Sequence, residues 1–595
     1  MSDKKAFKRG GSFLLEEVKP EEVFTPEDFR EEHKMIAVTT DDFVKRDVVP
    51  HMEALEHKDY ELTRKAMRKA GELGLLGAEV PEEYGGGGLD TVASLLIAEH
   101  MVWAGSFSVT LNAHTGIGTM PLVFFGTEAQ KKKYLPGLCS GETPGCYALT
   151  EPGAGTDALS SQSTAVLTPD GKHYKLNGTK QFITNGGFAD VITTYAKVDG
   201  QKFTAFVLDR SLEGVSTGPE EKKMGIRGTS TVSIILEDVK VPVDNVVFEV
   251  GKGHVVAFNI LDLGRLKLGG ASAGVGKMAI EACVKYGKER VQFGKPICQF
   301  GLIKQKIADM AIRTYLVESM AYITGGMIDV ILETLDHKAA DFGRQSGKAI
   351  EEYAIECSIN KVYGSEMLGL IVDEAVQLFG GYGYVEDYPV EQMYRDSRIL
   401  RIFEGTNEIN RLIIMQFLTR KAMKNEIPLL EAMGKVKAEL PAIKPLVPAV
   451  NGRPLQYQGQ LVERAKKLFI FVTEAAVTKY GQDIAEEQEV LGRLSDIAIE
   501  VFAMECGLAR AQKCMDKQGV EAAEMKINMM KVCVNDAVAR ISEYAREVLV
   551  ATAAPDALQG QLATVNNLMH QERVNTVALR RAIADNTIAA EKYIC

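Results

Sequence analysis

Residues 172–198 read KHYKLNGTKQFITNGGFADVITTYAKV and alternate apolar with polar side chains over segments of strand length. Because successive side chains of a strand point to opposite faces of a sheet, this pattern predicts β-strands, and Asn177-Gly178 predicts a hairpin turn between them. Lys202–Asp209 and Thr229–Val241 are rich in β-branched residues at strand length. We therefore predict a β-domain over residues 144–250.

The residues on either side of this domain follow a helical period instead. Upstream, Thr25 is expected to cap a helix whose first position is Pro26, where a missing N–H is tolerated. The glycines of 85–88 predict a loop between helices. Downstream, apolar residues recur at the spacing of one helix face at Met367, Ile371, Ala375 and Leu378.

A proline-rich stretch between Pro428 and Pro454 predicts a linker. Beyond it a further helix face is marked by Leu461, Ala465, Leu468, Val472 and Ala476. The predicted fold class is α+β, mostly α. It has an N-terminal helical domain, a middle β-domain, a C-terminal helical bundle and an extra helical domain, with boundaries at 20–143, 144–250, 251–427 and 428–595.

The composition is that of an ordinary globular protein, with 595 residues, 46% hydrophobic and 25% charged, which excludes a mainly disordered chain. Lys+Arg of 69 against Asp+Glu of 80 leaves a net charge of −11, so we expect no nucleic-acid partner. The 9 Cys and 9 His show no CxxC, HxxxH or HExxH spacing, which predicts reduced thiols and no metal site.

The sequence also predicts a cytoplasmic protein. The basic N-terminal residues MSDKKAFKRGGSF lack an apolar signal core, and no apolar run approaches the roughly 20 residues that span a bilayer. Residues 421–454 carry six basic and three acidic residues and are broken by five prolines, so we expect no stable membrane anchoring.

Two short motifs lie in the predicted β-domain. Residues 146–157, CYALTEPGAGTD, form a glycine-rich loop whose backbone N–H groups could approach a phosphate; taken alone, an ordinary connecting turn is the better explanation. In residues 180–187, KQFITNGG, the alternation puts Phe182 and Thr184 on one strand face, where a flat cofactor could stack. Taken alone, an ordinary half-buried hairpin is the better explanation of that segment.

Two more motifs lie in the predicted bundle. Residues 401–407, RIFEGTN, place Glu404 in a loop before a helix, where Ile402 and Phe403 could desolvate it and raise its pKa toward that of a general base. Taken alone, a carboxylate placed favourably near a helix N-terminus is the better explanation. Segments 290–294 and 377–381 combine an arginine with paired glycines, which could bind a pyrophosphate. Taken individually, a surface ion pair and a helix C-cap are the better explanation.

Together and in this order, the segments resemble the acyl-CoA dehydrogenase family over about residues 30–425, and the extra C-terminal block resembles its very-long-chain branch. The resemblance implies a helical domain, a β-domain and a four-helix bundle, with FAD between the last two and part of it contacted by a second subunit. It therefore implies a homo-oligomer, expected to be a dimer.

The resemblance also implies roles for individual residues. Glu404 matches the catalytic base that removes the α-proton of an acyl thioester. The substrate positions are matched by Thr156, Asp262, Arg265 and Gly405. The FAD positions are matched by Tyr147, Leu149, Thr150, Thr156, Phe182, Ile183, Thr184, Arg290, Gln292, Phe293, Gln377, Gly380, Gly381, Thr406 and Glu408.

The sequence departs from the family pattern in three places. Thr156 stands where serine is usual and keeps the hydroxyl, and Phe182 replaces a frequent tryptophan, which loses an N–H donor. In some branches the base lies at the position of Gly264, which here has no side chain. That absence strengthens the assignment of Glu404.

The implied reaction is α,β-dehydrogenation of an acyl-CoA, expected to be long-chain, to the trans-2-enoyl-CoA in fatty-acid β-oxidation. An electron-transferring flavoprotein is the implied electron acceptor. Two alternatives remain open: an acyl-CoA oxidase, which passes electrons to oxygen, and a non-catalytic assembly protein that keeps the fold.

Overall fold

The computed structural model describes residues 8–449 and 452–595, which fall into two compact units. The bundle unit contains residues 8–28, Val275–Met327 and the described part of Glu352–Cys595; the β unit contains Phe29–Gly274 and Ile328–Glu351. Helices dominate and one large sheet is present, which confirms the predicted mostly-α, α+β class. The four predicted domain boundaries stay a prediction.

The β unit begins with short helices. These are α1 (Glu31–Phe43), α2 (Met52–Glu56), α3 (Tyr60–Glu72), α4 (Thr91–His100), α5 (Ser106–Ala113), α6 (Met120–Phe125) and α7 (Glu128–Ser140). It also contains α10 (Phe342–Glu351) and the adjoining parts of two long helices, α8 (Gly253–Glu289) and α9 (Gly301–Leu332). Three of the short helices begin at a capping side chain, since Asp59, Asp90 and Thr127 accept backbone N–H groups of the first turn.

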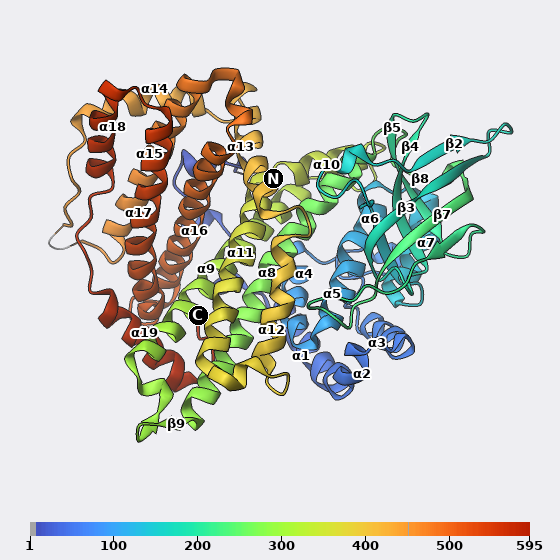
Figure 1. The fold of residues 1–595 in the computed structure, drawn as a ribbon, viewed down its shortest axis with the longest axis horizontal. Coiled ribbons are helices and arrows are strands. Elements are labelled where there is room, and N and C mark those ends of the chain that lie inside the picture. The colour runs from blue at the N-terminus through green and yellow to red at the C-terminus, as the bar shows by residue number, and fades with distance from the viewer. Residues whose placement is uncertain (1–7, 450–451) are drawn as a thin grey trace, which may run out of the picture. The chain divides into compact units, whose positions relative to one another are not determined.

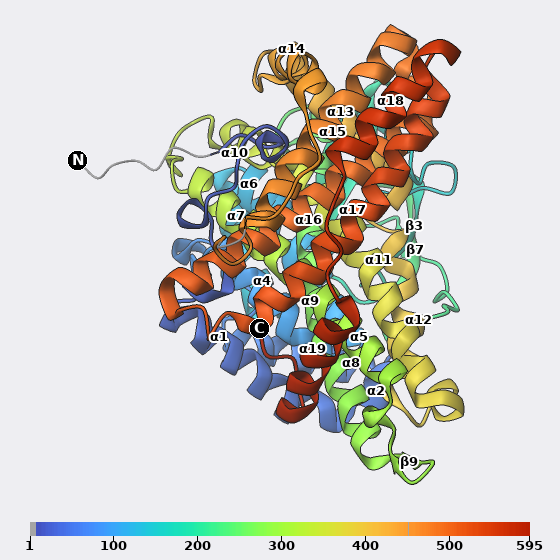
Figure 2. The same cartoon turned by 90° about the vertical axis from the view of Figure 1, so that its left-hand side faces the viewer.

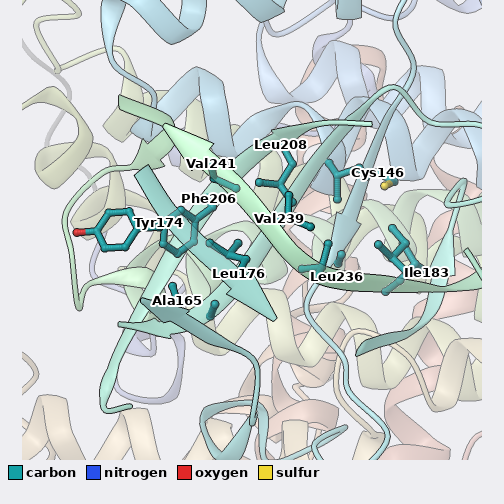
Figure 3. Close-up of a cluster of buried hydrophobic side chains, with 14 of the residues drawn as sticks. Cys146, Ala165, Tyr174, Leu176, Ile183, Phe206, Leu208, Leu236, Val239 and Val241 are labelled. Carbon is teal, nitrogen blue, oxygen red and sulfur yellow. The ribbon is translucent and has the colours of Figure 1, made fainter. Parts of the chain in front are cut away.

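The sheet of the β unit is mixed. Its strands are β1 (Gly145–Ala148), β2 (Thr164–Leu167), β3 (His173–Thr184), β4 (Val191–Val198), β5 (Lys202–Asp209), β6 (Val215–Thr217), β7 (Thr231–Pro242) and β8 (Val246–Val247). The order is β6-β7-β3-β2-β4-β5-β8, with β1 paired to β4. Figure 3 shows Leu176, Phe206 and Val241, from three different strands, in the buried apolar cluster of this sheet.

Asn177-Gly178 does not form the predicted hairpin turn. Both residues lie inside β3, which runs for 12 residues and pairs with both β2 and β7. The register shifts between Leu176 and Gly178, so the dipeptide forms an irregularity in the ladder. A Cβ at position 178 would lie 2.1 Å from Ser163 Oγ, so the absence of a side chain allows Ser163 to lie close to this backbone. The turn between β2 and β3 is formed by residues 168–172 instead.

The bundle unit consists of long helices and one small hairpin. Besides parts of α8 and α9 it contains β9 (Val291–Gln292), β10 (Lys295–Pro296), α11 (Ala354–Phe379), α12 (Pro389–Ser397), α13 (Asn407–Met423), α14 (Leu429–Glu439), α15 (Gln456–Tyr480), α16 (Gln488–Gln518), α17 (Glu524–Thr552), α18 (Pro555–Leu568) and α19 (Thr576–Ala590). Helices α15, α16 and α17 pack side by side (Figure 1, Figure 2), and α13 packs on both α11 and α16.

The helix expected at Thr25-Pro26 is only a 3₁₀ turn, Pro26–Asp28, and the first α-helix begins at Glu31. Thr25 donates its hydroxyl and its backbone N–H to the Asp28 carboxylate, so it does not act as the predicted cap. The reason lies in the bundle unit, where Glu27 and Asp28 form ion pairs with residues of α16.

One helix contradicts the expectation that no apolar run approaches bilayer length. By length and composition, α9 could cross a membrane: its most apolar 18-residue window has a mean hydropathy of 1.3, but 78% of that window is buried inside the protein. Polar residues such as Thr314 and Ser319 interrupt the run in sequence while leaving the average hydropathy high. Burial of this kind is common in the core helix of a folded domain.

Candidate active site

The loop that carries Glu404 lies between the 3₁₀ turn Arg398–Arg401 and helix α13 of the bundle unit. Glu404 and Gly405 have φ angles of 57° and 81°, so two successive residues adopt the left-handed conformation, which is unfavourable for a residue with a Cβ. Thr406 then caps α13, because its hydroxyl accepts the N–H of Ile409. The Oε2 atom of Glu404 is shielded from solvent.

Polar side chains hold the carbonyl groups of this loop. Lys361 Nζ donates to the Gly405 carbonyl at 2.6 Å, and Asn410 Nδ2 donates to the Gly405 and Thr406 carbonyls at 2.9 and 3.0 Å. Lys361 and Asn410 are both fully buried. The loop is thus fixed from its carbonyl side. Ile402 is 49% exposed, and the predicted desolvation of Glu404 by Ile402 and Phe403 stays a prediction.

A second set of predicted residues surrounds one cavity of the bundle unit. The cavity has a volume of about 920 Å³ and is lined by Arg290, Gln292, Phe293, Gly380, Gly381 and Tyr382, among others. Phe293 is 94% exposed, and a Cβ at either glycine would meet no atom within 4 Å. The rim therefore offers an aromatic face, a guanidinium and an uncovered backbone. Gln377 lies on α11 one turn earlier and does not line this cavity.

The glycine-rich loop belongs to the β unit and is anchored by a buried ion pair. Lys180 Nζ on β3 lies 2.6 Å from Glu151 Oε1, and their side chains are 0% and 5% exposed. Glu151 also accepts the N–H groups of Gln162 and Ser163. Burial raises its pKa, but the charge of Lys180 and the hydrogen bonds from Lys180, Ser163 and Gln162 together lower it overall. Beyond this anchor, Thr156 is exposed, and Gly153 and Gly155 have open space around them.

Phe182 interrupts the strand that carries it. Its φ is 59°, and the pairing of β3 with β7 shifts between Lys180 and Ile183. The regular alternation of side chains is therefore broken at this point, and it does not place Phe182 and Thr184 on one face of the strand. The bulge leaves the Phe182 ring 58% exposed and buries Ile183.

The remaining predicted residues of the β unit are mostly buried. Tyr147 and Leu149 are each 7% exposed, and the centroids of the Tyr147 and Tyr195 rings are 5.4 Å apart. On α8, Arg265 donates to Asp262 at 2.7 Å in a buried ion pair. Tyr147 Oη reaches the carbonyl of Ala257 on the same helix at 3.5 Å, so these residues belong to one packed region of the β unit.

Comparison with known proteins identifies the family. Three family descriptions match in succession: "Acyl-CoA dehydrogenase, N-terminal domain" at residues 30–142, "Acyl-CoA dehydrogenase, middle domain" at 146–239, and "Acyl-CoA dehydrogenase, C-terminal domain" at 251–419. A fourth, also described as "Acyl-CoA dehydrogenase, C-terminal domain", matches residues 464–567. The chain belongs to the acyl-CoA dehydrogenase family.

Relatives extend this acyl-CoA dehydrogenase match to the whole chain. A "probable acyl-CoA dehydrogenase" of Bacillus subtilis is 48% identical and covers 98% of both chains. The mitochondrial very long-chain specific acyl-CoA dehydrogenase of Bos taurus is 39% identical over 79% of this chain and 73% of its own length. A crystal structure of an acyl-CoA dehydrogenase complexed with FAD, from Bacillus anthracis, is 48% identical, with a TM-score of 0.97 over 99% and 100% of the two chains.

Sequence reasoning missed the residues that support the candidate site of this acyl-CoA dehydrogenase. Lys361 and Glu151 were not singled out. Lys361 lies on α11 among the apolar residues Ile359 and Val362, and a lysine at such a position is a signal that could have revealed it. Glu151 and Lys180 stand 29 positions apart, and no local pattern connects them.

Proposed function

We propose that this protein is an FAD-dependent acyl-CoA dehydrogenase that converts a long-chain acyl-CoA to the trans-2-enoyl-CoA in fatty-acid β-oxidation. The observation that carries the proposal is Glu404, a carboxylate on a left-handed loop whose carbonyls are fixed by buried side chains, in a chain whose domains match the family throughout. A carboxylate held in this way is suited to act as a general base.

The residues present fit a flavin cofactor. In the bundle unit, the cavity bordered by Arg290, Phe293 and Gly380 combines a cation for a phosphate with open space over glycine backbone. In the β unit, the exposed ring of Phe182 and the open loop around Gly155 supply a stacking face and backbone N–H groups. We propose that these two groups bind FAD, together with the other FAD residues named from the sequence.

The chain's own residues supply the acid–base part of the reaction. The carboxylate of Glu404 takes the proton from the α-carbon of the thioester, and the backbone N–H of Glu404 donates to the thioester carbonyl as charge develops there. Asp262, Arg265, Thr156 and Gly405 would border the substrate. When bound, FAD supplies the two-electron acceptor for the β-hydrogen.

We further propose a cytoplasmic homodimer that passes its electrons to an electron-transferring flavoprotein. The cavity residues Arg290, Gln292 and Phe293 are all exposed on the single chain, which suits contact with a ligand held by a second copy. An oxidase remains the alternative, and peroxide formation in air would distinguish it.

The decisive experiment is anaerobic titration of the purified yellow protein with acyl-CoAs of graded chain length. We expect loss of the oxidised flavin absorbance with one equivalent of a long-chain acyl-CoA, and slower loss with butyryl-CoA. A protein that purifies without flavin, or whose flavin is not bleached by any chain length, would contradict the proposed function.

Replacing Arg290 with alanine should weaken FAD retention and dimer association together. The guanidinium borders the cavity and is 5.6 Å from the Tyr382 ring centroid; loss of a charge-assisted contact to a phosphate costs about 1.5–3 kcal/mol. Flavin-to-protein ratio and size-exclusion chromatography measure both effects. Arg546→Met, on α17, is a control that removes an exposed arginine elsewhere. An unchanged dimer with full flavin in Arg290→Ala would argue against the shared site.

A further inference from the structure

Helix α13, which begins directly after the Glu404 loop, is bonded to helix α16 of the C-terminal extension. Arg411 Nε on α13 donates to Asp496 Oδ1 on α16 at 2.7 Å. Ser495 Oγ donates to the Arg411 carbonyl at 2.6 Å. Asp496 is 13% exposed and Arg411 20%, so this pair is more protected from water than an ordinary surface ion pair.

Arg411 also faces α11. Its Nη1 and Nη2 atoms donate to the two carboxylate oxygens of Glu366 at 2.8 and 3.0 Å. This paired arrangement fixes the guanidinium in both position and orientation. Burial alone would lower the pKa of Arg411, but its bonds to Glu366 and Asp496 raise it above the ordinary value.

The same carboxylate connects Arg411 to the Glu404 loop. Glu366 Oε1 accepts from Asn407 Nδ2 at 3.0 Å, and Asn407 Oδ1 accepts from Lys361 Nζ at 2.7 Å. Lys361 Nζ donates in turn to the Gly405 carbonyl. A continuous chain of hydrogen bonds therefore runs from Asp496 in the extension to the carbonyl of Gly405, the residue that follows Glu404.

The loop needs such support because of its conformation. A glutamate in the left-handed region persists only where the surrounding structure imposes it, and here the neighbouring Gly405 is left-handed as well. If the anchor of Lys361 and Asn407 shifts, the carboxylate of Glu404 moves with the loop. A displacement of the order of 1 Å in a reacting group can slow a reaction substantially.

We propose that Arg411 and Asp496 are positioning residues, through which the C-terminal extension holds Glu404 in its reactive orientation. This inference rests on the proposed role of Glu404 as the base. The inference gives Asp496 of the extension a task in the reaction, although its helix α16 supplies none of the predicted site residues.

The test compares Asp496→Asn with the wild-type holoenzyme. The amide keeps the size of the side chain but removes the charge of one of the two carboxylates that hold Arg411, the other being Glu366. We expect the rate constant for flavin reduction at saturating acyl-CoA to fall about tenfold, while the half-saturating substrate concentration changes less than about twofold. Amide hydrogen exchange of residues 402–406 should become faster. Asp496→Glu, which keeps the carboxylate, should restore most of the rate.

Glu500→Gln is the matched control, since it removes an ion pair between the same helix α16 and Arg540 of α17, at 2.6 Å, away from the loop. It should leave the reduction rate unchanged. A wild-type reduction rate in Asp496→Asn, or an equal loss in Glu500→Gln, would overturn the positioning role. If no acyl-CoA reduces the wild-type flavin, the proposed function itself fails; if wild type is reduced, Glu404→Gln is slow and Asp496→Asn is normal, the positioning inference alone fails.

Discussion

Replacing Glu404 with glutamine should leave FAD bound and lower the rate of flavin reduction by about a thousandfold or more. Glutamine has the size of glutamate and can keep the loop conformation, but it cannot accept the α-proton. A thousandfold loss corresponds to about 4 kcal/mol of barrier. Because Gly264 has no side chain, that position cannot substitute for the missing base.

Anaerobic stopped-flow mixing with a long-chain acyl-CoA measures this rate directly. Glu426→Gln is the matched control, since it changes an exposed carboxylate just beyond the other end of α13 and should reduce at the wild-type rate. Flavin content and unfolding temperature should be equal in both variants. Reduction of the Glu404→Gln flavin within a few fold of wild type would mean that another group removes the proton.

Replacing Arg510 with methionine should destabilise the bundle unit by about 3–5 kcal/mol, since it strands buried carboxylates. Arg510 is fully buried on α16. Its Nε donates to Glu27 of the N-terminal segment, and its Nη1 donates to Glu318 of α9. Burial alone would raise the pKa of Glu318, but the charges of Arg510 and Lys277 lower it to about 2. Without Arg510 the Glu318 carboxylate loses the largest of the interactions that offset the cost of its burial.

Urea unfolding followed by circular dichroism tests this expectation through the shift of the midpoint. Arg546→Met, at an exposed pair with Glu543, is the control and should cost no more than about 1 kcal/mol. The double variant Arg510→Met with Glu318→Gln should recover part of the loss, because it removes the stranded charge as well. If Arg510→Met unfolds at the wild-type midpoint, the buried cluster does not hold the extension to α9.

Local periodicity was sufficient for much of the fold. The β-branched run at Lys202–Asp209 forms β5 with the same two ends. The five residues predicted to mark one helix face are all buried along α15: Leu461, Ala465, Leu468, Val472 and Ala476. Helices and strands place neighbouring residues at fixed angles, so a pattern of burial appears directly in the order of residues. The loop before α13 was predictable for the same reason, because it precedes a regular helix face.

The sequence by itself therefore determined many of the helices and strands, the family and the residue proposed as the base, but not the turn at Asn177-Gly178 or the first helix. The tertiary structure decided what surrounds them: Gly178 lies at an irregularity of β3 where Ser163 comes close. The hydrogen bonds that reach the Glu404 loop involve Lys361, 43 positions earlier, and, farther along the chain of bonds, Asp496, 92 positions later. Hydrogen bonds and ion pairs act over a few ångströms regardless of separation along the chain. Their partners become apparent only once folding has brought distant helices together.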